Sequence, residues 1–390
     1  MSKLKNKFCT GCGACYNICQ KNAITMTENE KGFLVPIIDQ NNCINCNSCI
    51  MVCPLNNYKN NNTTNPDVFS MVNNNEEIRL KSSSGGIFYL LAKTIINQGG
   101  IVFACIWDEK IQPKHVSACS IEDILKMQGS KYVQSDTKKT YIEVKEYLKI
   151  GKKVLYVGTP CQIAGLKSFL SKDYEQLYSV DLICHGVPSR KIFDLFKKEF
   201  CESHNISENI TNINMRSKIT DWGKPFTTIL STENKEYIIP FENNNFLESF
   251  LHNYNINDSC TDCKFNILPR SGDVTLGDFC GVDEFDKSLN DKKGISVLLI
   301  NSDKGKAMFN DIKENCSCRD IPLKDAAQYN RNILCSTKEN AFRDKFFNCI
   351  MSGKSLHDSM KNSRNTYPKL LKIFYNLQPD FIKNMIKRFL

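Results

Sequence analysis

Two runs of cysteine near the start of the chain constrain its fold more than any other feature of the sequence. Together they hold eight of the twenty cysteines, and they read Cys9-Thr-Gly-Cys12-Gly-Ala-Cys15-Tyr-Asn-Ile-Cys19 and Cys43-Ile-Asn-Cys46-Asn-Ser-Cys49-Ile-Met-Val-Cys53-Pro54. In this spacing the first three thiolates of a run surround one four-iron cubane, and the fourth ligates the other cubane. We therefore assign two 4Fe-4S clusters, one to Cys9, Cys12, Cys15 and Cys53, the other to Cys43, Cys46, Cys49 and Cys19.

A pair of zinc ribbons is the alternative for these two runs. Zinc ribbons use CxxC pairs, and they have no use for the CxxxC step that ends each run. The spacing therefore favours a ferredoxin-like module of the bacterial type over residues 1–58, with a short β pattern at 33–38. Gln20 stands where such a run usually has proline, whereas Pro54 keeps that place. Because proline is not a ligand, cluster binding should survive this departure.

Composition indicates a larger globular protein around this module. With 390 residues, of which 41% are hydrophobic, the chain can form two or three domains. Iron–sulfur ligation needs reduced thiolates, and the sequence contains neither a signal-peptide pattern nor an apolar run of membrane-spanning length, so we expect an oxygen-poor cytoplasm. The net charge of +9 would suit acidic partners such as ferredoxins. The basic residues are scattered among acids, and we expect no nucleic-acid site.

The rest of the chain alternates between helical and strand patterns. A polar stretch without periodicity predicts a linker over residues 59–78. Helical patterns follow at 86–97, at 141–149 and after Pro160. The strand patterns lie at 101–107, 154–158, 177–183, 210–215, 226–230, 237–241, 273–279 and 295–300. The order strand, helix, strand after residue 154 predicts a βαβ unit, and the segments between 210 and 241 predict an antiparallel layer.

A second group of cysteines recurs where turns are expected. It consists of Cys161, Cys184, Cys260 and Cys263, which come from three separate loops. Their thiolates suit a third cluster, and a zinc site on the same four residues is the alternative. Cys161 lies near a predicted helix start, where the helix dipole favours a thiolate. We interpret Cys105, Cys119, Cys201 and most of the last four cysteines as small buried hydrophobic residues.

Six motifs in order resemble the coenzyme F420 hydrogenase/dehydrogenase β-subunit family across nearly the whole chain. They are Ser83-Ser-Gly-Gly86, Gly129-Ser-Lys-Tyr-Val-Gln-Ser135, Gly158-Thr-Pro-Cys-Gln-Ile-Ala-Gly165, Asp181-Leu-Ile-Cys-His-Gly186, the CxxC at 260 and Arg270-Ser-Gly-Asp-Val-Thr-Leu-Gly-Asp-Phe279. The resemblance implies FAD and a third 4Fe-4S cluster, with Cys161, Cys184, Cys260 and Cys263 as its ligands. Cys280 stands where the family usually has tryptophan, and we do not count it as a ligand.

The predicted fold class is therefore α+β and multidomain. A ferredoxin-like module with two 4Fe-4S clusters precedes a mixed α/β flavin-binding domain and a C-terminal helical tail. The resemblance divides the flavin-binding domain into a first part at 79–150 and a second part at 151–320 that holds the third cluster. Residues 321–390 form the helical C-terminal region, with two short basic amphipathic helices after residue 367. Such a tail docks on its own domain or a partner subunit, or it contacts a membrane surface.

Candidate flavin contacts come from three of these motifs. They are Ser83, Ser84, Gly85, Gly86, Ser130, Lys131, Tyr132, Arg270 and Asp278. Small residues before a helix let backbone amides approach an anion, although serines there are also ordinary helix caps. Lys131 would pair with a phosphate or the flavin ring, or it lies in solvent. Arg270 and Asp278 would position ring or substrate, or they form a structural ion pair.

These features predict a ferredoxin-linked, FAD-dependent oxidoreductase. Clusters move single electrons, and a flavin collects two and passes them on as hydride. Electrons would come from ferredoxin or a partner subunit and reach a small organic substrate, for which coenzyme F420 is one candidate. His185 would supply a proton, or it only hydrogen-bonds the backbone. The alternatives are a flavin-bearing subunit of a larger hydrogenase or dehydrogenase complex, and a non-enzymatic polyferredoxin-like carrier. The sequence leaves the oligomeric state open.

Overall fold

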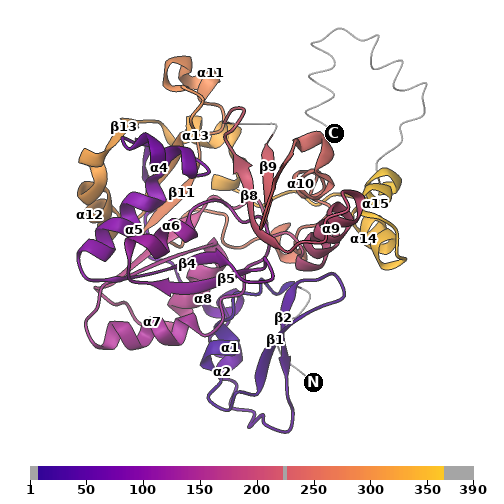
Figure 1. Ribbon diagram of the computed structural model, residues 1–390. Coiled ribbons are helices and arrows are strands. Elements are labelled where there is room, and N and C mark those ends of the chain that lie inside the picture. Colours follow the sequence, from indigo (N-terminus) through magenta and orange to yellow (C-terminus); the bar gives the residue numbers. More distant parts are fainter. Residues whose placement is uncertain (1–7, 223–225, 364–390) are drawn as a thin grey trace.

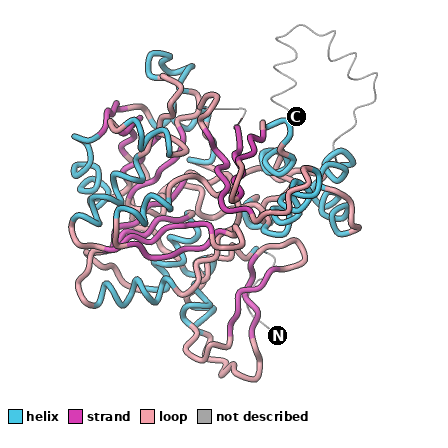
Figure 2. The backbone as a smooth tube through the Cα atoms, viewed as in Figure 1, coloured by secondary structure: helices cyan, strands magenta, loops and turns pink. Residues whose placement is uncertain are grey.

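A mixed sheet of eight strands forms the centre of the protein. The computed structural model describes residues 8–222 and 226–363. From one edge of the sheet to the other, the strands are β13 (Cys316–Asp320), β3 (Asp67–Asn73), β12 (Ser296–Ile300), β11 (Val274–Asp278), β7 (Leu177–Leu182), β6 (Val154–Gly158), β4 (Ile101–Trp107) and β5 (Pro113–Ala118). Figure 2 shows these strands as the magenta core, with helices around them.

The strand directions bring several strand ends to one edge of the sheet. β11, β7, β6 and β4 are mutually parallel, which confirms the predicted βαβ unit of β6, α8 (Pro160–Leu170) and β7. β12 runs antiparallel to β11, and β3 runs antiparallel to β12, so β3 points the same way as β11. The carboxyl ends of β3, β4, β6, β7 and β11 therefore meet at the same edge.

Alternating side chains place one apolar core on each face of the sheet. In β6, Leu155 and Val157 face a core with α5 (Ile87–Asn97), α6 (Ile121–Met127) and α12 (Asp303–Ile312). Val154 and Tyr156 face the opposite core, with α7 (Thr140–Lys149) and α8. This alternation is the two-residue period of a strand that is buried on both faces.

Helices and a small three-stranded sheet form a second lobe, built from the chain between β7 and β11 and from the last two described helices. β8 (Ile210–Ser217), β9 (Thr227–Thr232) and β10 (Glu236–Ile239) pair antiparallel, as predicted. The helices of this lobe are α9 (Arg190–Ser203), α10 (Asn245–Leu251), α14 (Arg343–Met351) and α15 (Leu356–Ser363). Their phenylalanines form a third core, which includes Phe33 from the cysteine-rich module.

Other short helices and turns lie in the segments between these elements. They are α4 (Glu76–Lys81), α11 (Val282–Asp286), α13 (Leu323–Tyr329) and the short 3-10 turns η2 (Phe241–Asn243), η3 (Asp258–Cys260), η4 (Lys287–Leu289), η5 (Lys313–Asn315) and η6 (Arg331–Ile333).

The cysteine-rich module forms a lobe below the large sheet (Figure 1). It contains α1 (Ala14–Ile18), the hairpin of β1 (Ile24–Glu28) and β2 (Leu34–Ile38), α2 (Ser48–Met51) and α3 (Pro54–Asn57). Cys12, Ala14 and Val52 are buried in the same core as α7 and α8. The module and the sheet therefore share apolar packing, which holds one against the other.

The predicted linker at 59–78 is wrong over half of its length. Residues 67–73 form β3, an inner strand of the large sheet, and residues 76–81 form α4. Even the polar part is bound, because the side-chain amides of Asn60 and Asn62 donate to backbone carbonyls of Arg270 and its neighbours. Asparagine-rich sequence predicts a free spacer, and the prediction fails here because the hydrogen-bond partners lie about two hundred residues away.

Two further expectations concern the C-terminal tail and membrane-spanning helices. The predicted basic helices after residue 367 lie outside the described residues. Within the described ranges, no helix combines the length and apolar character that crossing a bilayer requires.

His115 is a buried histidine in the interior of the large sheet, and its burial makes the stability of the fold depend on pH. It stacks on Tyr156 with ring centroids 5.4 Å apart, and Nε2 donates to the Val157 carbonyl at 3.0 Å. Nδ1 has no hydrogen-bond partner among the described residues, and burial lowers the pKa of His115 from 6.5 to about 4. Below pH 6.5 the unfolded chain therefore binds a proton that the folded chain does not bind.

We expect the free energy of unfolding to fall as the pH is lowered from 6.5 toward 4, and His115→Gln to remove part of that fall. Urea unfolding at a series of pH values measures the slope. The control is His204→Gln, because His204 is exposed. Equal slopes in the wild-type and His115→Gln proteins would contradict this assignment.

Candidate functional site

The candidate residues gather at the carboxyl edge of the parallel strands. β6 ends at Gly158, shortly before Cys161, and β7 ends at Leu182, shortly before Cys184. β11 ends at Asp278, and the chain after β3 leads through α4 to Ser83. In open α/β sheets this edge is where ligands bind. The structure therefore brings together segments that the sequence separates by up to about two hundred residues.

The first cysteine set surrounds a cavity of about 200 Å³. Its walls include all four assigned thiols, namely Cys9, Cys12, Cys15 and Cys53. The same cavity is lined by Ser259, Asp262 and Lys264, which flank the cysteines of the CxxC pair. Burial, with a smaller contribution from the charge of Cys53, raises the pKa of the Cys9 thiol to about 11 and that of Cys15 to about 12. Cys53 thus lies with the first run, as the crossed ligand pattern requires.

The second cysteine set lies at the surface of the module. Cys46 is exposed, and hydrogen bonds from Ser48 lower its pKa. Cys43 and Cys46 are close enough to Cys49 for their charges to raise its pKa, after the larger effect of burial. Cys19 directly follows α1, which packs on the helix α2 that carries Cys49. The two sets therefore differ in their access to solvent.

The third cysteine set converges from the start of α8, the loop after β7 and the segment around η3. Burial raises the pKa of Cys184 well above its usual range, and the charges of Cys260, Cys161 and Cys263 add to that effect. The backbone N–H of Val187 donates to Cys260 Sγ at 3.4 Å. We expected the helix start to favour a Cys161 thiolate, but burial dominates and raises its pKa to about 12.

Buried thiols with raised pKa values fit a cationic ligand. Four thiolates in one buried site repel one another unless a metal centre compensates their charge. In the first set, the four cysteines also line a cavity that could hold such a centre. Among the described residues, no group of three or more histidine, cysteine, aspartate or glutamate side chains is arranged so that it could hold a single metal ion.

The Ser83–Gly86 segment is held tightly against the sheet edge. Ser84 Oγ donates to the Ile295 carbonyl at 2.7 Å, and the backbone N–H of Gly85 donates to Ser296 Oγ at 2.9 Å. A Cβ on Gly85 would lie 2.3 Å from the Met71 carbonyl oxygen, so only glycine fits there. Ser83 Oγ accepts from the Ser130 N–H at 2.6 Å. Two of the predicted motifs are thus in direct contact.

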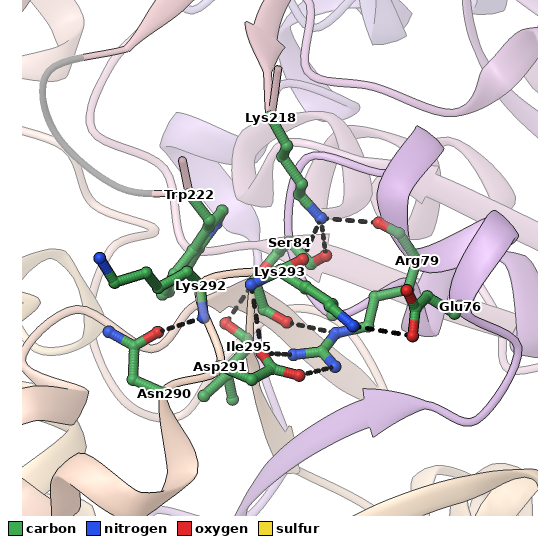
Figure 3. Close-up of polar contacts among 12 residues, drawn as sticks. Glu76, Arg79, Ser84, Lys218, Trp222, Asn290, Asp291, Lys292, Lys293 and Ile295 are labelled. Carbon is green, nitrogen blue, oxygen red and sulfur yellow. Dashed lines mark hydrogen bonds and ion pairs between the residues drawn. The ribbon is translucent and has the colours of Figure 1, made fainter. Parts of the chain in front are cut away.

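A clamp that the sequence did not predict closes over this segment (Figure 3). Lys218 Nζ donates to the carbonyls of Arg79, Ser84 and Lys293, each at 2.6 Å. Trp222 Nε1 donates to the Ser83 carbonyl at 3.1 Å. Arg79 in turn forms a bidentate pair with Asp291, with N···O distances of 2.7 and 2.6 Å. Burial and the charge of Arg79 lower the pKa of Lys218 to about 7.

A second cluster at this edge joins Tyr132 to Asp278 through Arg216. Arg216 Nη1 lies 2.9 Å from the Tyr132 hydroxyl and 2.7 Å from Asp278 Oδ2. The guanidinium also stacks on Phe226, with Cζ 3.9 Å from the ring centroid. Arg216 was missed because a single arginine in a strand pattern carries no spacing signal, and its partners lie more than sixty residues away.

Three other predicted residues have structural partners. Lys131 Nζ donates to the carbonyls of Met127, Gln128 and Gly129, and it thereby caps the end of α6. His185 Nε2 lies 2.6 Å from Asn253 Oδ1, and its ring meets Phe250 edge-on. Arg270 does not pair with Asp278.

Arg270 is fully buried and belongs to the sheet interior. It pairs with the equally buried Asp181 at 3.5 Å and donates to the Leu182 carbonyl at 2.8 Å. Asp181 also accepts from the backbone of Ser271 and Gly272. With no exposed surface, Arg270 cannot contact a ligand directly, and its assignment as a flavin contact is wrong. The pair instead ties the loop before β11 to β7.

Two family models match the chain, in the order that the motifs predict. Residues 8–57 match a 4Fe-4S dicluster domain, and residues 151–324 match the C-terminal part of the coenzyme F420 hydrogenase/dehydrogenase beta subunit. An uncharacterized protein of Methanocaldococcus jannaschii is 26% identical over 333 residues, which cover 77% of this chain and 85% of that protein.

One further relative and one solved structure have names that state a function. A coenzyme F420-dependent sulfite reductase of the same organism is 23% identical over 318 residues, which cover 80% of this chain. The match spans 47% of the reductase, about half of its length. A chain of the F420-reducing [NiFe] hydrogenase complex of Methanosarcina barkeri is similar at 17% identity with a TM-score of 0.45, over 77% of this chain and 90% of that chain.

The cysteine-lined cavity and the dicluster-domain match together define an iron–sulfur protein, which is similar in sequence to a coenzyme F420-dependent sulfite reductase. In chain order, a region similar to a 4Fe-4S dicluster domain is followed by a region similar to the C-terminal part of the coenzyme F420 hydrogenase/dehydrogenase beta subunit.

Removal of the buried carboxylate tests the structural role of Arg270. Asp181→Ala leaves the Arg270 charge buried without its partner, so we expect a loss of about 3–5 kcal/mol in the free energy of unfolding. Urea unfolding followed by circular dichroism measures it. The control is Glu77→Ala, which removes a pair with Lys81 at the surface and should leave the unfolding midpoint unchanged. Similar midpoints for the two variants would show that the buried pair is not needed.

Proposed function

We propose that this chain is a ferredoxin-linked, FAD-dependent oxidoreductase that reduces a small organic substrate, for which coenzyme F420 is the first candidate. When bound, the clusters would transfer single electrons, and the flavin would collect two and deliver them as hydride. Cys9, Cys12, Cys15 and Cys53 would hold the first cluster, and Cys43, Cys46, Cys49 and Cys19 the second. Cys161, Cys184, Cys260 and Cys263 would hold the third.

One observation carries this proposal. The cavity of the first cysteine set is also lined by Ser259, Asp262 and Lys264, which neighbour the third set. Residues beside the third-set cysteines therefore form part of the wall of the first-set cavity, and Cys12 is close enough to Cys161 for its charge to raise the pKa of that thiol. This arrangement supports a connected series of redox sites, whereas independent carriers would have no need of it.

The exposed second set supports a partner protein at the input end. Ile44 and Met51 lie beside these cysteines, and they are 63% and 70% exposed. Apolar side chains around an exposed redox site favour short-lived contact with another protein. Ferredoxin is our candidate, and a partner subunit of a larger complex would use the same surface.

The flavin end would use the chemistry of the sheet edge. Arg216, held by Tyr132 and Asp278, provides a cationic group that suits a phosphate or an anionic flavin ring. Lys218 would hold the Ser84 carbonyl in place beside it. Ser83, Ser84, Gly85, Gly86 and Ser130 would shape the neighbouring backbone, and Lys131 would support it through α6. His185, oriented by Asn253, stays a candidate for holding a proton near the substrate.

Anaerobic purification and analysis test the proposal directly. We expect about twelve irons and one FAD per chain, without stoichiometric zinc, because three four-iron clusters are assigned. Reduced ferredoxin should then bleach the flavin absorption. Cys15→Ser should lower the iron content by about four and block bleaching by ferredoxin, while dithionite still bleaches the flavin. Zinc in place of iron, or material without flavin, would contradict the proposal.

Arg216→Ala tests the flavin end on its own. Because charge-assisted hydrogen bonds are lost, we expect FAD to bind about tenfold more weakly or worse, with the iron content unchanged. Fluorescence of released FAD measures the affinity. The matched control is Arg319→Ala, since Arg319 also pairs with an aspartate and lies over a phenylalanine ring, but at the far edge of the sheet. Equal FAD affinity in both variants would exclude Arg216 from the site.

A further inference from the structure

Tyr141 lies between the first and third cysteine sets. It is fully buried near the start of α7, and its hydroxyl oxygen lies 2.7 Å from the Cys12 carbonyl and 2.8 Å from the Gln162 carbonyl. Gln162 directly follows Cys161. Each carbonyl therefore belongs to a backbone segment that carries an assigned thiol of one set. A phenol has a single hydrogen, which it donates to one of these carbonyls or shares between both.

Helix α8 packs closely against the Cys12 loop and the Tyr141 hydroxyl. Gly165 lies on the face of α8 that meets the module. A Cβ there would lie 2.9 Å from Cys12 Sγ and 3.3 Å from the Tyr141 hydroxyl oxygen. Real Cβ contacts are longer than the first of these distances, so only glycine permits this approach. Helix α8 and the Cys12 loop are thus in contact where Tyr141 joins them.

The segment before Tyr141 reinforces the same junction. Gln134 Nε2 donates to the Thr10 carbonyl at 3.3 Å, and Thr137 Oγ1 donates to the Cys12 carbonyl at 3.3 Å. On the other side, Ser135 Oγ accepts from Gln162 Nε2 at 2.9 Å. The segment from 134 to 141 therefore binds the first-set loop and the start of α8, while Ser130, shortly before it, contacts Ser83.

We propose that Tyr141 is a positioning residue that fixes the first and third cysteine sets relative to each other, and that its hydroxyl biases how an electron is shared between the two clusters they would hold. The inference rests on the proposed function, since it assumes that both sets bind clusters. Hydrogen bonds around cluster ligands tune the reduction potential. The hydroxyl contacts the carbonyl of Cys12, which itself carries a first-set thiol, whereas Gln162 only follows the third-set Cys161, so the hydroxyl favours negative charge at the first set.

The test compares two buried tyrosines. Tyr141→Phe removes the bridging hydroxyl. Tyr156→Phe is the matched control, because Tyr156 is equally buried but its hydroxyl contacts Thr140 at 3.0 Å instead of a cysteine loop. The readout is the ratio of reduced first to reduced third cluster, from electron paramagnetic resonance of the anaerobic protein at one ambient potential. Cys15→Ser and Cys184→Ser assign the two signals.

We expect the ratio to fall about fivefold in Tyr141→Phe and to stay at the wild-type value in Tyr156→Phe, with iron content preserved in both. A 3-fluorotyrosine in place of Tyr141 keeps the shape and makes the hydroxyl a stronger donor, so it should raise the ratio. This substitution decides the matter should Tyr141→Phe fail to fold.

An unchanged ratio in the variants that fold, or a shift in the opposite direction, would overturn the inference and leave the proposed function intact. Wild-type protein without four-iron signals from both sets would instead overturn the proposed function.

Discussion

The parallel alignment of β4, β6, β7 and β11 is the constraint on which the rest of the structure depends. Because these strands point the same way, the segments that follow β6, β7 and β11 leave the sheet at one edge. The buried Asp181 and Arg270 stabilise this alignment, since they join β7 to the loop that enters β11. Cys161 and Cys184 shortly follow the ends of β6 and β7, and Asp278 ends β11, so the shared direction of these strands brings the three residues to one edge.

Close packing between the module and α8 is the second condition for a connected site. Cys12 and Ala14 are buried with side chains of α8, and Gly165 allows the two backbones to approach. The first set is consequently shielded by protein, whereas the second set faces solvent at the outer end of the module. This gradient of exposure gives the proposed series of redox sites a direction in space, from a surface open to partner proteins toward the carboxyl edge of the sheet.

Local pattern was a good guide to the inner strands and their helices. The apolar runs of β4, β6 and β12 are buried on both faces, so composition and length alone marked them. The linker prediction fails at β3 because Asp67 and Ser70 interrupt the apolar character of that strand. Its strand conformation depends on pairing with β12 and β13, which lie more than two hundred residues later in the chain.

Among the polar residues of the candidate site, too, some were predicted from local motifs and others depend on contacts between distant segments. Ser83 and Ser130 belong to motifs, and the structure brings them into contact. Lys131 also belongs to a motif, yet its ammonium caps α6, because three carbonyls at a helix end are the acceptors within reach. Arg216, Lys218 and Trp222 carry no spacing signal. They reach the site only because the strand β8 and the loop after it pass over the sheet edge.

By itself, the sequence determined what short segments can determine: cysteine spacing predicted the ligands of the proposed clusters, and hydrophobic periodicity predicted the inner strands. Only the tertiary structure decided which of these groups are neighbours. Cys12 meets Gly165, Asp181 pairs with Arg270, and Arg216 joins Tyr132 to Asp278 through contacts between distant segments. Such contacts depend on how strands and helices pack into layers, and that packing minimises apolar exposure and unpaired buried charge over the whole chain at once.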